Sequence, residues 1–267
     1  MGNFVTPKAF LIAETAVDEV AMKRALEHLG VKDWTSDAQD DASLLTEFAG
    51  KSCYMSFDTS LNQNLTRTGG RTNHEYIQKG IVGNKHGSVL EHATVTFFMT
   101  NVSRVVTHEI IRHRAGTAFS QTSGRYVRTD QIDMYYPQIF NQMEPGVTDD
   151  LEIEFCNAIN QMEESIVKMA ELTQINKWSF DIKKKLTSAF RRLIGNGQAN
   201  HIVVTANHRA WRHMIEMRTD PHAEEEIRVV FADVSRQLRA KYPAIYADAK
   251  ITEVDGIEVT TFSNSKV

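Results

Sequence analysis

Residues 93–114 read ATVTFFMTNVSRVVTHEIIRHR, and the pattern of this stretch changes about halfway along it. Its first eight residues are mostly β-branched or aromatic, which predicts a strand. Ser103 can then cap a helix, because its hydroxyl can accept a hydrogen bond from a backbone N–H of the first turn. Val102, Val106 and Ile110 recur at the spacing of one helical face. The stretch therefore predicts a strand that runs directly into a helix over 103–114.

Helical patterns dominate the rest of the chain. Asp18 and Ser36 can each cap the start of a helix, and Gly30 can end the first of the two. Apolar residues at spacings of three and four predict a long amphipathic helix from Leu151 to Met169. Other helices are expected at 19–29, at 181–194, at 207–217 and from Asp220-Pro221 onward, with short strands at 202–205 and after Pro243. Helices with a few strands predict an α+β fold, a helix-rich single domain with a small mixed β-sheet.

The composition is that of a globular protein with a core of its own. Of the 267 residues, 42 % are hydrophobic and 24 % are charged, and the net charge is -4. These values exclude the disordered and collagen-like classes. Cys53 and Cys156 are the only cysteines, so neither a disulfide framework nor a zinc module is supported. No apolar run approaches about 18 residues, and we expect a cytoplasmic protein that does not interact with membranes.

Residues 104–128 form the most basic part of the chain. Five arginines stand there against one acidic residue, Glu109, and they are Arg104, Arg112, Arg114, Arg125 and Arg128. Such a concentration in a chain of net negative charge favours an anionic ligand. Arginine binds phosphate oxygens through two parallel N–H groups, and the small residues 115–118 let backbone amides approach a ligand. A phosphorylated ligand is one interpretation, and a solvated basic surface is the other.

A second polar cluster follows at 207–222. If it begins with a helix, Arg209 and His213 are neighbours one turn apart, and Asn207 caps the start. Spacing alone does not decide whether the two clusters share a cleft. The run HEIIRH at 108–113 places its histidines five residues apart, so they do not lie on one helix face as a zinc-binding pair would. The glycine-rich phosphate loops GxGxxG and GxxxxGK(S/T) are absent, so a nucleotide must be held by other groups.

Two stretches of the central region resemble the signature of flavin-dependent thymidylate synthases. They are Ser103-Arg104-x-x-Thr107-His108-Glu109-Ile110-Ile111-Arg112-His113-Arg114 and Phe119-Ser120-Gln121-Thr122-Ser123-Gly124-Arg125-Tyr126. The resemblance continues at 47–54, 86–92, Arg191, 207–213, Arg218 and 222–223, in order over about 45–230. One departure is that eight residues, 115–122, separate Arg114 from Ser123, where the family signature has seven. Either Thr122 takes the position of the signature serine or one residue is inserted after Arg114. The intact ending of the second stretch favours the insertion, which would bulge this loop.

The resemblance implies a single catalytic domain over 1–267, in which the helices of 1–40 and the tail 244–267 extend the core. It also implies reductive methylation of dUMP to dTMP, with methylenetetrahydrofolate as the carbon donor, FAD as the hydride carrier and NADPH as the reductant. Members of the family form homotetramers that bind FAD and dUMP between subunits. A related C5 hydroxymethylation of the nucleotide is the alternative reaction. An arginine-rich module that binds nucleic acid is a different class, which the net charge of -4 disfavours.

Matching positions carry the family's site residues over to this chain. The resemblance makes Arg218 the catalytic residue, a cation that stabilises the N3 anion of uracil. It implies contacts with FAD from Ser88, Arg112, His113, Arg114, Gln121, Asn207, His208, Arg209 and His213. It implies contacts with dUMP from Glu109, Arg112, Gln121, Thr122, Ser123, Gly124, Arg125, Arg191 and Arg218. No metal site is expected, and the absence of a Pro-Cys-His triplet argues against a thiolate nucleophile.

Overall fold

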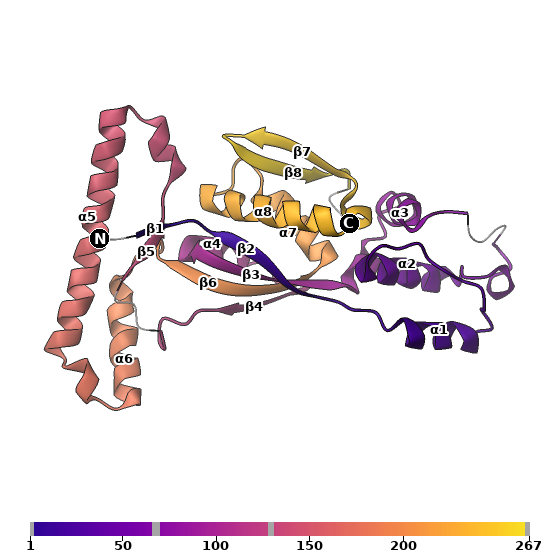
Figure 1. The fold of residues 1–267 in the computed structure, drawn as a ribbon, viewed down its shortest axis with the longest axis horizontal. Coiled ribbons are helices and arrows are strands. Elements are labelled where there is room, and N and C mark those ends of the chain that lie inside the picture. The colour runs from indigo at the N-terminus through magenta and orange to yellow at the C-terminus, as the bar shows by residue number, and fades with distance from the viewer. Residues whose placement is uncertain (1–2, 66–69, 128–130, 265–267) are drawn as a thin grey trace.

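A four-stranded antiparallel sheet, in the order β2-β3-β6-β4, lies at the centre of the molecule (Figure 1). The computed structural model describes residues 3–65, 70–127 and 131–264. The strands of this sheet are β2 (Lys8–Glu14), β3 (Thr94–Ser103), β6 (Ala199–Asn207) and β4 (Thr117–Gln121). Val95, Phe97 and Met99 alternate along β3 and are fully buried, so one face of the sheet forms the core. The predicted strand is confirmed and extends to Ser103.

Helices cover that face of the sheet, and a hairpin covers the helices. The elements are α4 (Arg104–Ile110), α7 (His208–Arg218), α8 (Glu225–Lys241), α9 (Pro243–Tyr246), β7 (Ala249–Val254) and β8 (Ile257–Phe262). In Figure 1 the hairpin β7-β8 lies on the side of α7 and α8 that faces away from the sheet. The Trp211 ring of α7 packs 5.1 Å from the Phe97 ring and 6.4 Å from the Phe231 ring of α8, between centroids. This buried aromatic group joins the sheet to both helices.

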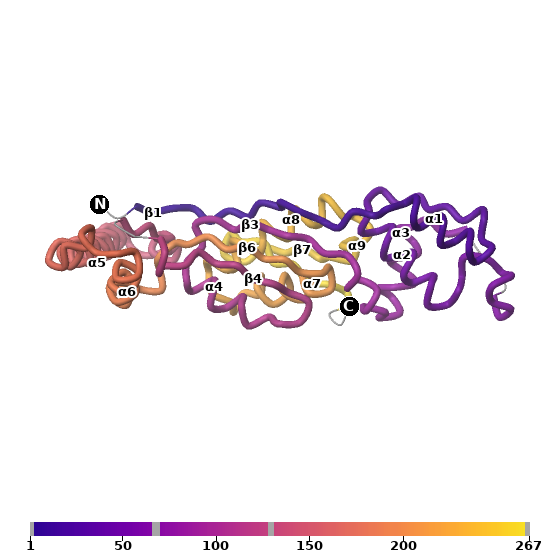
Figure 2. The backbone as a smooth tube through the Cα atoms, turned by 90° about the horizontal axis from the view of Figure 1, so that it is seen from below, coloured from indigo at the N-terminus to yellow at the C-terminus, as the bar shows by residue number. Residues whose placement is uncertain are grey.

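Helical segments extend the molecule beyond both ends of the sheet (Figure 2). One end holds α1 (Glu19–His28), α2 (Asp41–Tyr54), α3 (Asn73–Glu75) and a π-helical segment, Tyr76–Val82. The other end holds α5 (Pro145–Leu172) and α6 (Phe180–Phe190), beside β1 (Asn3–Val5) and β5 (Asp133–Tyr135), which pair in parallel. Short 3₁₀ helices lie at Thr59–Leu61, Gly87–Glu91, Gln138–Gln142, Ile175–Lys177 and Arg191–Leu193. None of the helices in the described part of the chain has both the length and the apolar character that a membrane span requires.

The predicted helix-rich α+β fold is confirmed, but the central sheet is antiparallel and not mixed, because the parallel pair β1-β5 forms a separate sheet. Two helices also begin elsewhere than the sequence indicated. Asp40 caps α2, and the Ser36 hydroxyl donates instead to Glu47 Oε2 at 2.6 Å. Glu224 caps α8, so Asp220-Pro221 belongs to the turn before that helix. In both cases a carboxylate closer to the first turn accepts the free backbone N–H groups, and the predicted start was therefore too early.

The helix predicted over 103–114 is shorter than expected, because α4 ends at Ile110. Ser103 caps its start, as predicted. The chain then turns so that β4 can pair with β6, and tertiary pairing limits the length of the helix. Because the pairing of β4 is continuous from Thr117 to Gln121, this strand holds no bulge. Any extra residue in the loop therefore lies before Thr117 or after Gln121.

Candidate active site

The pairing of β4 with β6 places the turn before β4 beside the start of α7. Thr117, the first residue of β4, pairs with Ala206, and α7 begins directly after β6. The backbone oxygen of Gly116 accepts a hydrogen bond from the Asn207 backbone N at 3.1 Å. A Cβ atom on Gly116 would lie 2.3 Å from Asn207 Nδ2, and the φ of Gly116 is +69°, so a residue without a side chain is required. This close approach joins the arginine-rich segment to the second polar cluster.

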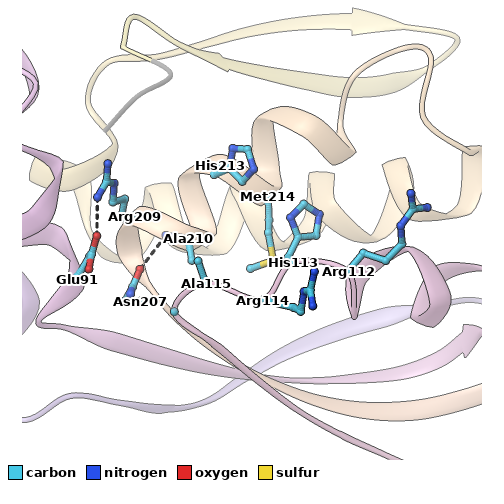
Figure 3. A pocket seen from close by; sticks show the side chains of 11 residues that line it. Glu91, Arg112, His113, Arg114, Ala115, Asn207, Arg209, Ala210, His213 and Met214 are labelled. Atoms are coloured by element: carbon cyan, nitrogen blue, oxygen red, sulfur yellow. Dashed lines mark hydrogen bonds and ion pairs between the residues drawn. The ribbon is translucent and has the colours of Figure 1, made fainter.

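A pocket of about 350 Å³ opens at this junction (Figure 3). The start of α7 forms one wall and the segment that follows α4 forms the other. Six of the nine residues that the sequence assigned to FAD line the pocket, and they are Arg112, His113, Arg114, Asn207, Arg209 and His213. Glu91, Ala115, Gly116, Ala210 and Met214 complete the lining. The pocket is therefore cationic, and its size lies within the usual range for a small-molecule site.

A larger cavity of about 640 Å³ shares Arg209 with this pocket. It is lined by Ser88, another residue assigned to FAD, and by Tyr54, Arg71, Tyr76 and His86 among others. Glu91 Oε1 lies 2.5 Å from Arg209 Nη1, and Glu91 is the only acidic residue lining the smaller pocket in the described part of the chain. Sequence reasoning did not select Glu91, although it lies within the matching stretch 86–92.

Arg218, the last residue of α7, has its guanidinium group against the end of α4. Its Nη1 donates to Glu109 Oε2 at 2.8 Å, and its Nη2 donates to the Glu109 backbone oxygen at 2.9 Å. Its Nε donates to His113 Nε2 at 2.9 Å. The side chain is only 13 % exposed, so these three hydrogen bonds fix the plane of the group. A guanidinium has five N–H donors, and one on each terminal nitrogen is therefore left for a ligand.

His113 is neutral in this arrangement. Burial is the main cause that lowers the pKa of its imidazole to about 4, and the charges of Arg218 and His213 act in the same direction. Because Nε2 accepts from Arg218, the hydrogen-bond pattern assigns the proton of the neutral ring to Nδ1. The ring lies edge-on to that of His213, with centroids 5.6 Å apart, and Figure 3 shows it beside Met214.

Two further arginines meet beside the start of α4. Arg104 Nη2 and Arg191 Nη1 lie 3.6 Å and 4.0 Å from the position that a Cβ atom on Gly124 would take. Burial, and then the charge of Arg191, lower the pKa of Arg104. Arg104 donates to Asn200 Oδ1 at 3.2 Å, and no described carboxylate forms an ion pair with either arginine. Two cations without a counter-charge around a glycine are suited to an anion such as phosphate. Sequence reasoning counted Arg104 in the basic segment but did not assign it to the site.

The other residues assigned to dUMP extend along the side of α4. Gln121 Nε2 donates to Thr107 Oγ1 at 3.0 Å, between the Arg104 end and the Glu109 end of the helix. Arg104 and Glu109 are five residues apart, and α4 rises about 1.5 Å per residue. The spacing of these two ends of the helix is therefore comparable with the size of a mononucleotide. The Thr122 hydroxyl donates to the backbone oxygen of His201 at 3.2 Å.

Lys184, which sequence reasoning did not assign to the site, lies beside the aromatic ring of Tyr126. Lys184 Nζ of α6 lies 4.7 Å from the centroid of this ring, and hydrogen bonding with Lys184 lowers the pKa of Tyr126. Arg125 is exposed next to it, and its backbone N donates to Ser123 Oγ at 3.4 Å. Arg128 belongs to the same basic segment of the sequence, but it lies outside the residues that the structure describes.

The structure does not bring the side chain of His208, which the resemblance assigned to FAD, to the pocket. Its side chain is fully buried, its Nδ1 lies 3.0 Å from the Tyr246 hydroxyl, and its ring packs edge-on to Tyr242 with centroids 4.6 Å apart. Successive residues of a helix point about 100° apart. The side chain of His208 therefore enters the core, while that of the adjacent Arg209 lines the pocket.

The chain is similar in sequence to known proteins over most of its length. Residues 36–244 match the family model described as thymidylate synthase complementing protein. The chain is 36 % identical over 259 residues to the flavin-dependent thymidylate synthase of Mycobacterium tuberculosis, which covers 94 % of this chain and 97 % of that protein. The protein of the same name from Mycobacterium marinum is 36 % identical over 260 residues, with the same coverage of 94 % and 97 %.

Two solved structures share the fold at low sequence identity. Thymidylate synthase X from Helicobacter pylori, solved with FAD and dUMP, has a TM-score of 0.57 at 16 % identity and covers 91 % of this chain and 98 % of its own. A UMP/dUMP methylase from Streptomyces cacaoi, bound with 5-Br dUMP, has a TM-score of 0.61 at 16 % identity and covers 92 % and 95 %. At this identity the likeness shows that the fold is shared.

Proposed function

The chain belongs to the family of flavin-dependent thymidylate synthases, and we propose that it methylates dUMP at C5 to give dTMP. Methylenetetrahydrofolate is the carbon donor, FAD the hydride carrier and NADPH the reductant. One observation carries the proposal: a single cationic pocket is lined from both polar clusters, by Arg112, His113, Arg114, Asn207, Arg209 and His213, and His113 links that pocket to Arg218.

The chemistry of the pocket lining fits FAD. Arg112, Arg114 and Arg209 supply cations for its two phosphates, while the side chains of Asn207 and His213 supply hydrogen bonds to neutral polar groups. Ser88 belongs to the neighbouring cavity, which Arg209 joins to the pocket and which gives room for a dinucleotide. In the bound state FAD supplies hydride transfer, which no amino-acid side chain can perform.

Arg218 is the residue that we assign to the uracil ring. C5 of uracil is a poor carbon nucleophile until the ring gains electron density, and ionisation at N3 supplies such density. A guanidinium that keeps one N–H on each terminal nitrogen can donate both to N3 and to an adjacent carbonyl oxygen. Because Glu109 and His113 hold it in place, Arg218 stabilises the N3 anion without a change of its own position.

The other end of the nucleotide is assigned to the cations around Gly124. Arg104 and Arg191 bind the phosphate there, together with Ser123, Arg125 and Lys184 on the neighbouring segments. Gln121 and Thr122 lie between this end and the base. The absence of a side chain at Gly124 leaves space for phosphate oxygens between Arg104 and Arg191.

We assign the whole of 1–267 to one catalytic domain and infer that it acts as a homotetramer with its sites between subunits. The arm formed by α5 and α6 supports this inference, because it leaves large apolar side chains in solvent. Leu172 is 75 % exposed, Phe180 67 % and Ile153 58 %. Such side chains on one projecting arm are typical of a surface that another subunit covers.

The decisive experiment uses the purified protein with FAD, dUMP, methylenetetrahydrofolate and NADPH under anaerobic conditions. We expect a flavin absorbance spectrum, oxidation of the flavin only when the nucleotide and the folate are both present, and a product with the mass of dTMP. A protein that binds no flavin, even after reconstitution with FAD, contradicts the proposal. A product with the mass of the hydroxymethylated nucleotide supports instead the alternative reaction, C5 hydroxymethylation of the nucleotide.

A further inference from the structure

We propose that His113 is a positioning residue for the reaction, which holds the guanidinium of Arg218 through its Nε2 atom. This inference rests on the proposed function, because it concerns the residue that we assign to uracil. His113 lines the cofactor pocket, and its contact with Arg218 gives it a second role that a cofactor contact does not require.

The geometry explains why a third hydrogen bond is needed. Nη1 and Nη2 of Arg218 both donate to Glu109, one to its side chain and one to its backbone. With only these two contacts, the tilt of the guanidinium about the line that joins them would be set by its own flexible side chain alone. The bond from Nε to His113 Nε2, at 2.9 Å, is a third point outside that line and fixes the plane. The two N–H groups left for the substrate then point in one fixed direction.

The protonation state of His113 is suited to this role. An imidazolium has no free lone pair, so only the neutral ring with its proton on Nδ1 can accept from Arg218. The charged or titratable groups around the ring are Arg218, His213, Glu109 and Arg112. Three of these four disfavour a positive charge on the ring, as does its partial burial, while Glu109 alone favours it. The neutral form that the contact requires is therefore the form that the surroundings stabilise.

A double-mutant cycle tests this role. The measured quantity is the dissociation constant of dUMP from the FAD-saturated protein, followed by the change in flavin absorbance. In His113→Phe the ring shape remains but the acceptor is lost, and we expect dUMP to bind about tenfold more weakly, the size typical of a hydrogen bond to a charged group. In His113→Gln the amide oxygen takes the place of Nε2 as the acceptor. We expect this variant to recover at least half of the loss in dUMP affinity, measured as the logarithm of the dissociation constant.

The second half of the cycle separates positioning from other effects. In an Arg218→Ala background the His113→Phe exchange should change dUMP affinity less than twofold, because the residue through which His113 acts is missing. An undiminished, about tenfold further loss in that background overturns the proposal, as does a His113→Gln variant that binds no better than His113→Phe. The FAD content and thermal midpoint of each variant show that it is folded, and if His113→Phe does not fold, His113→Leu takes its place in the cycle. Failure of the wild-type protein to bind dUMP would instead contradict the proposed function.

Discussion

Arg218 holds Glu109 by two hydrogen bonds, one to the carboxylate and one to the peptide oxygen of the same residue. The carboxylate keeps the buried arginine partnered, so α7 and α4 are joined at the point where the second polar cluster ends. Glu109 also pairs with Arg112 at 3.3 Å. One acid therefore pairs with two cations, and Arg218 keeps two N–H donors that none of its three described hydrogen bonds uses.

Replacement of Arg218 should abolish product formation and leave the cofactor bound. We expect Arg218→Ala to lower the rate of dTMP formation by at least about a thousandfold, because removal of a preorganised donor from a developing anion typically costs a factor of about 10²–10³ and here two donors are lost. Arg218→Lys should recover little, since an ammonium cannot donate in a fork. The readouts are single-turnover rate and bound FAD per subunit, with the exposed Arg236→Ala as the control.

The phosphate site can be tested with two adjacent arginines. Arg191→Gln should raise the KM for dUMP by about 10- to 100-fold, because it removes a charge-assisted contact to phosphate. Arg192→Gln is the matched control. Arg192 has the same charge as Arg191 and is also exposed, but it is not among the residues next to Gly124. Deoxyuridine, which has no phosphate, should be used equally poorly by the wild-type protein and by Arg191→Gln. Equal effects of the two exchanges on dUMP would contradict the assignment.

A buried ion pair ties α7 to the tail, and its loss should affect stability more than chemistry. Arg212 donates to both carboxylate oxygens of Asp248 at 2.7 Å and 2.9 Å, and the side chains are 1 % and 7 % exposed. The guanidinium also donates to the Ile245 backbone oxygen at 2.8 Å and lies 4.1 Å from the Phe262 ring centroid. Asp248→Ala should cost about 3–5 kcal/mol in the free energy of unfolding, because it leaves a buried charge without its partner.

Chemical denaturation measures this change. The double exchange Arg212→Met with Asp248→Leu should be more stable than Asp248→Ala, since neither charge then remains buried alone. A loss below about 1 kcal/mol in Asp248→Ala would mean that the pair is solvated in solution.

The sequence predicted those parts of the molecule that local patterns determine. The strand predicted over 93–100, the cap at Asn207 and the long helix α5 all follow from patterns of neighbouring residues, and all three are present. The early end of α4 does not follow from such patterns, because it depends on the pairing of β4 with β6 across the chain.

The residues of the candidate site also fall into two groups, those that the sequence predicts and those whose place depends on tertiary packing. The matching stretches of sequence include six of the residues that line the pocket, but they also include His208, whose side chain the rotation of the helix turns into the core. Arg104 and Lys184 were not assigned, since their closeness to Gly124 and Tyr126 depends on how α4 and α6 pack. The spacing of apolar residues predicts which face of a helix is buried, but not which other element packs beside that helix.

His208 should make the stability of the protein depend on pH. Burial lowers its pKa from 6.5 to about 3, so the native state holds the ring neutral while the unfolded chain binds a proton below about pH 6.5. The unfolded state binds more protons in that range, and stability must fall as the pH drops from 6.5 towards 3. Above pH 6.5 this contribution is fully present. Between pH 7 and pH 4.5 we expect His208 alone to account for about 2–3 kcal/mol of the loss in unfolding free energy.

The exchange His208→Phe separates this effect from other titrations. It removes the hydrogen bond with Tyr246, so the variant should be less stable at pH 7 by about 1–3 kcal/mol. Its stability should nevertheless fall less steeply below pH 6.5, and the two curves should converge as the pH approaches 4.5. His92→Phe, a change at an exposed histidine, should leave the slope unchanged. Urea unfolding at several pH values measures both slopes, and equal slopes for wild type and His208→Phe would show that His208 is not the neutral, buried group on which this argument depends.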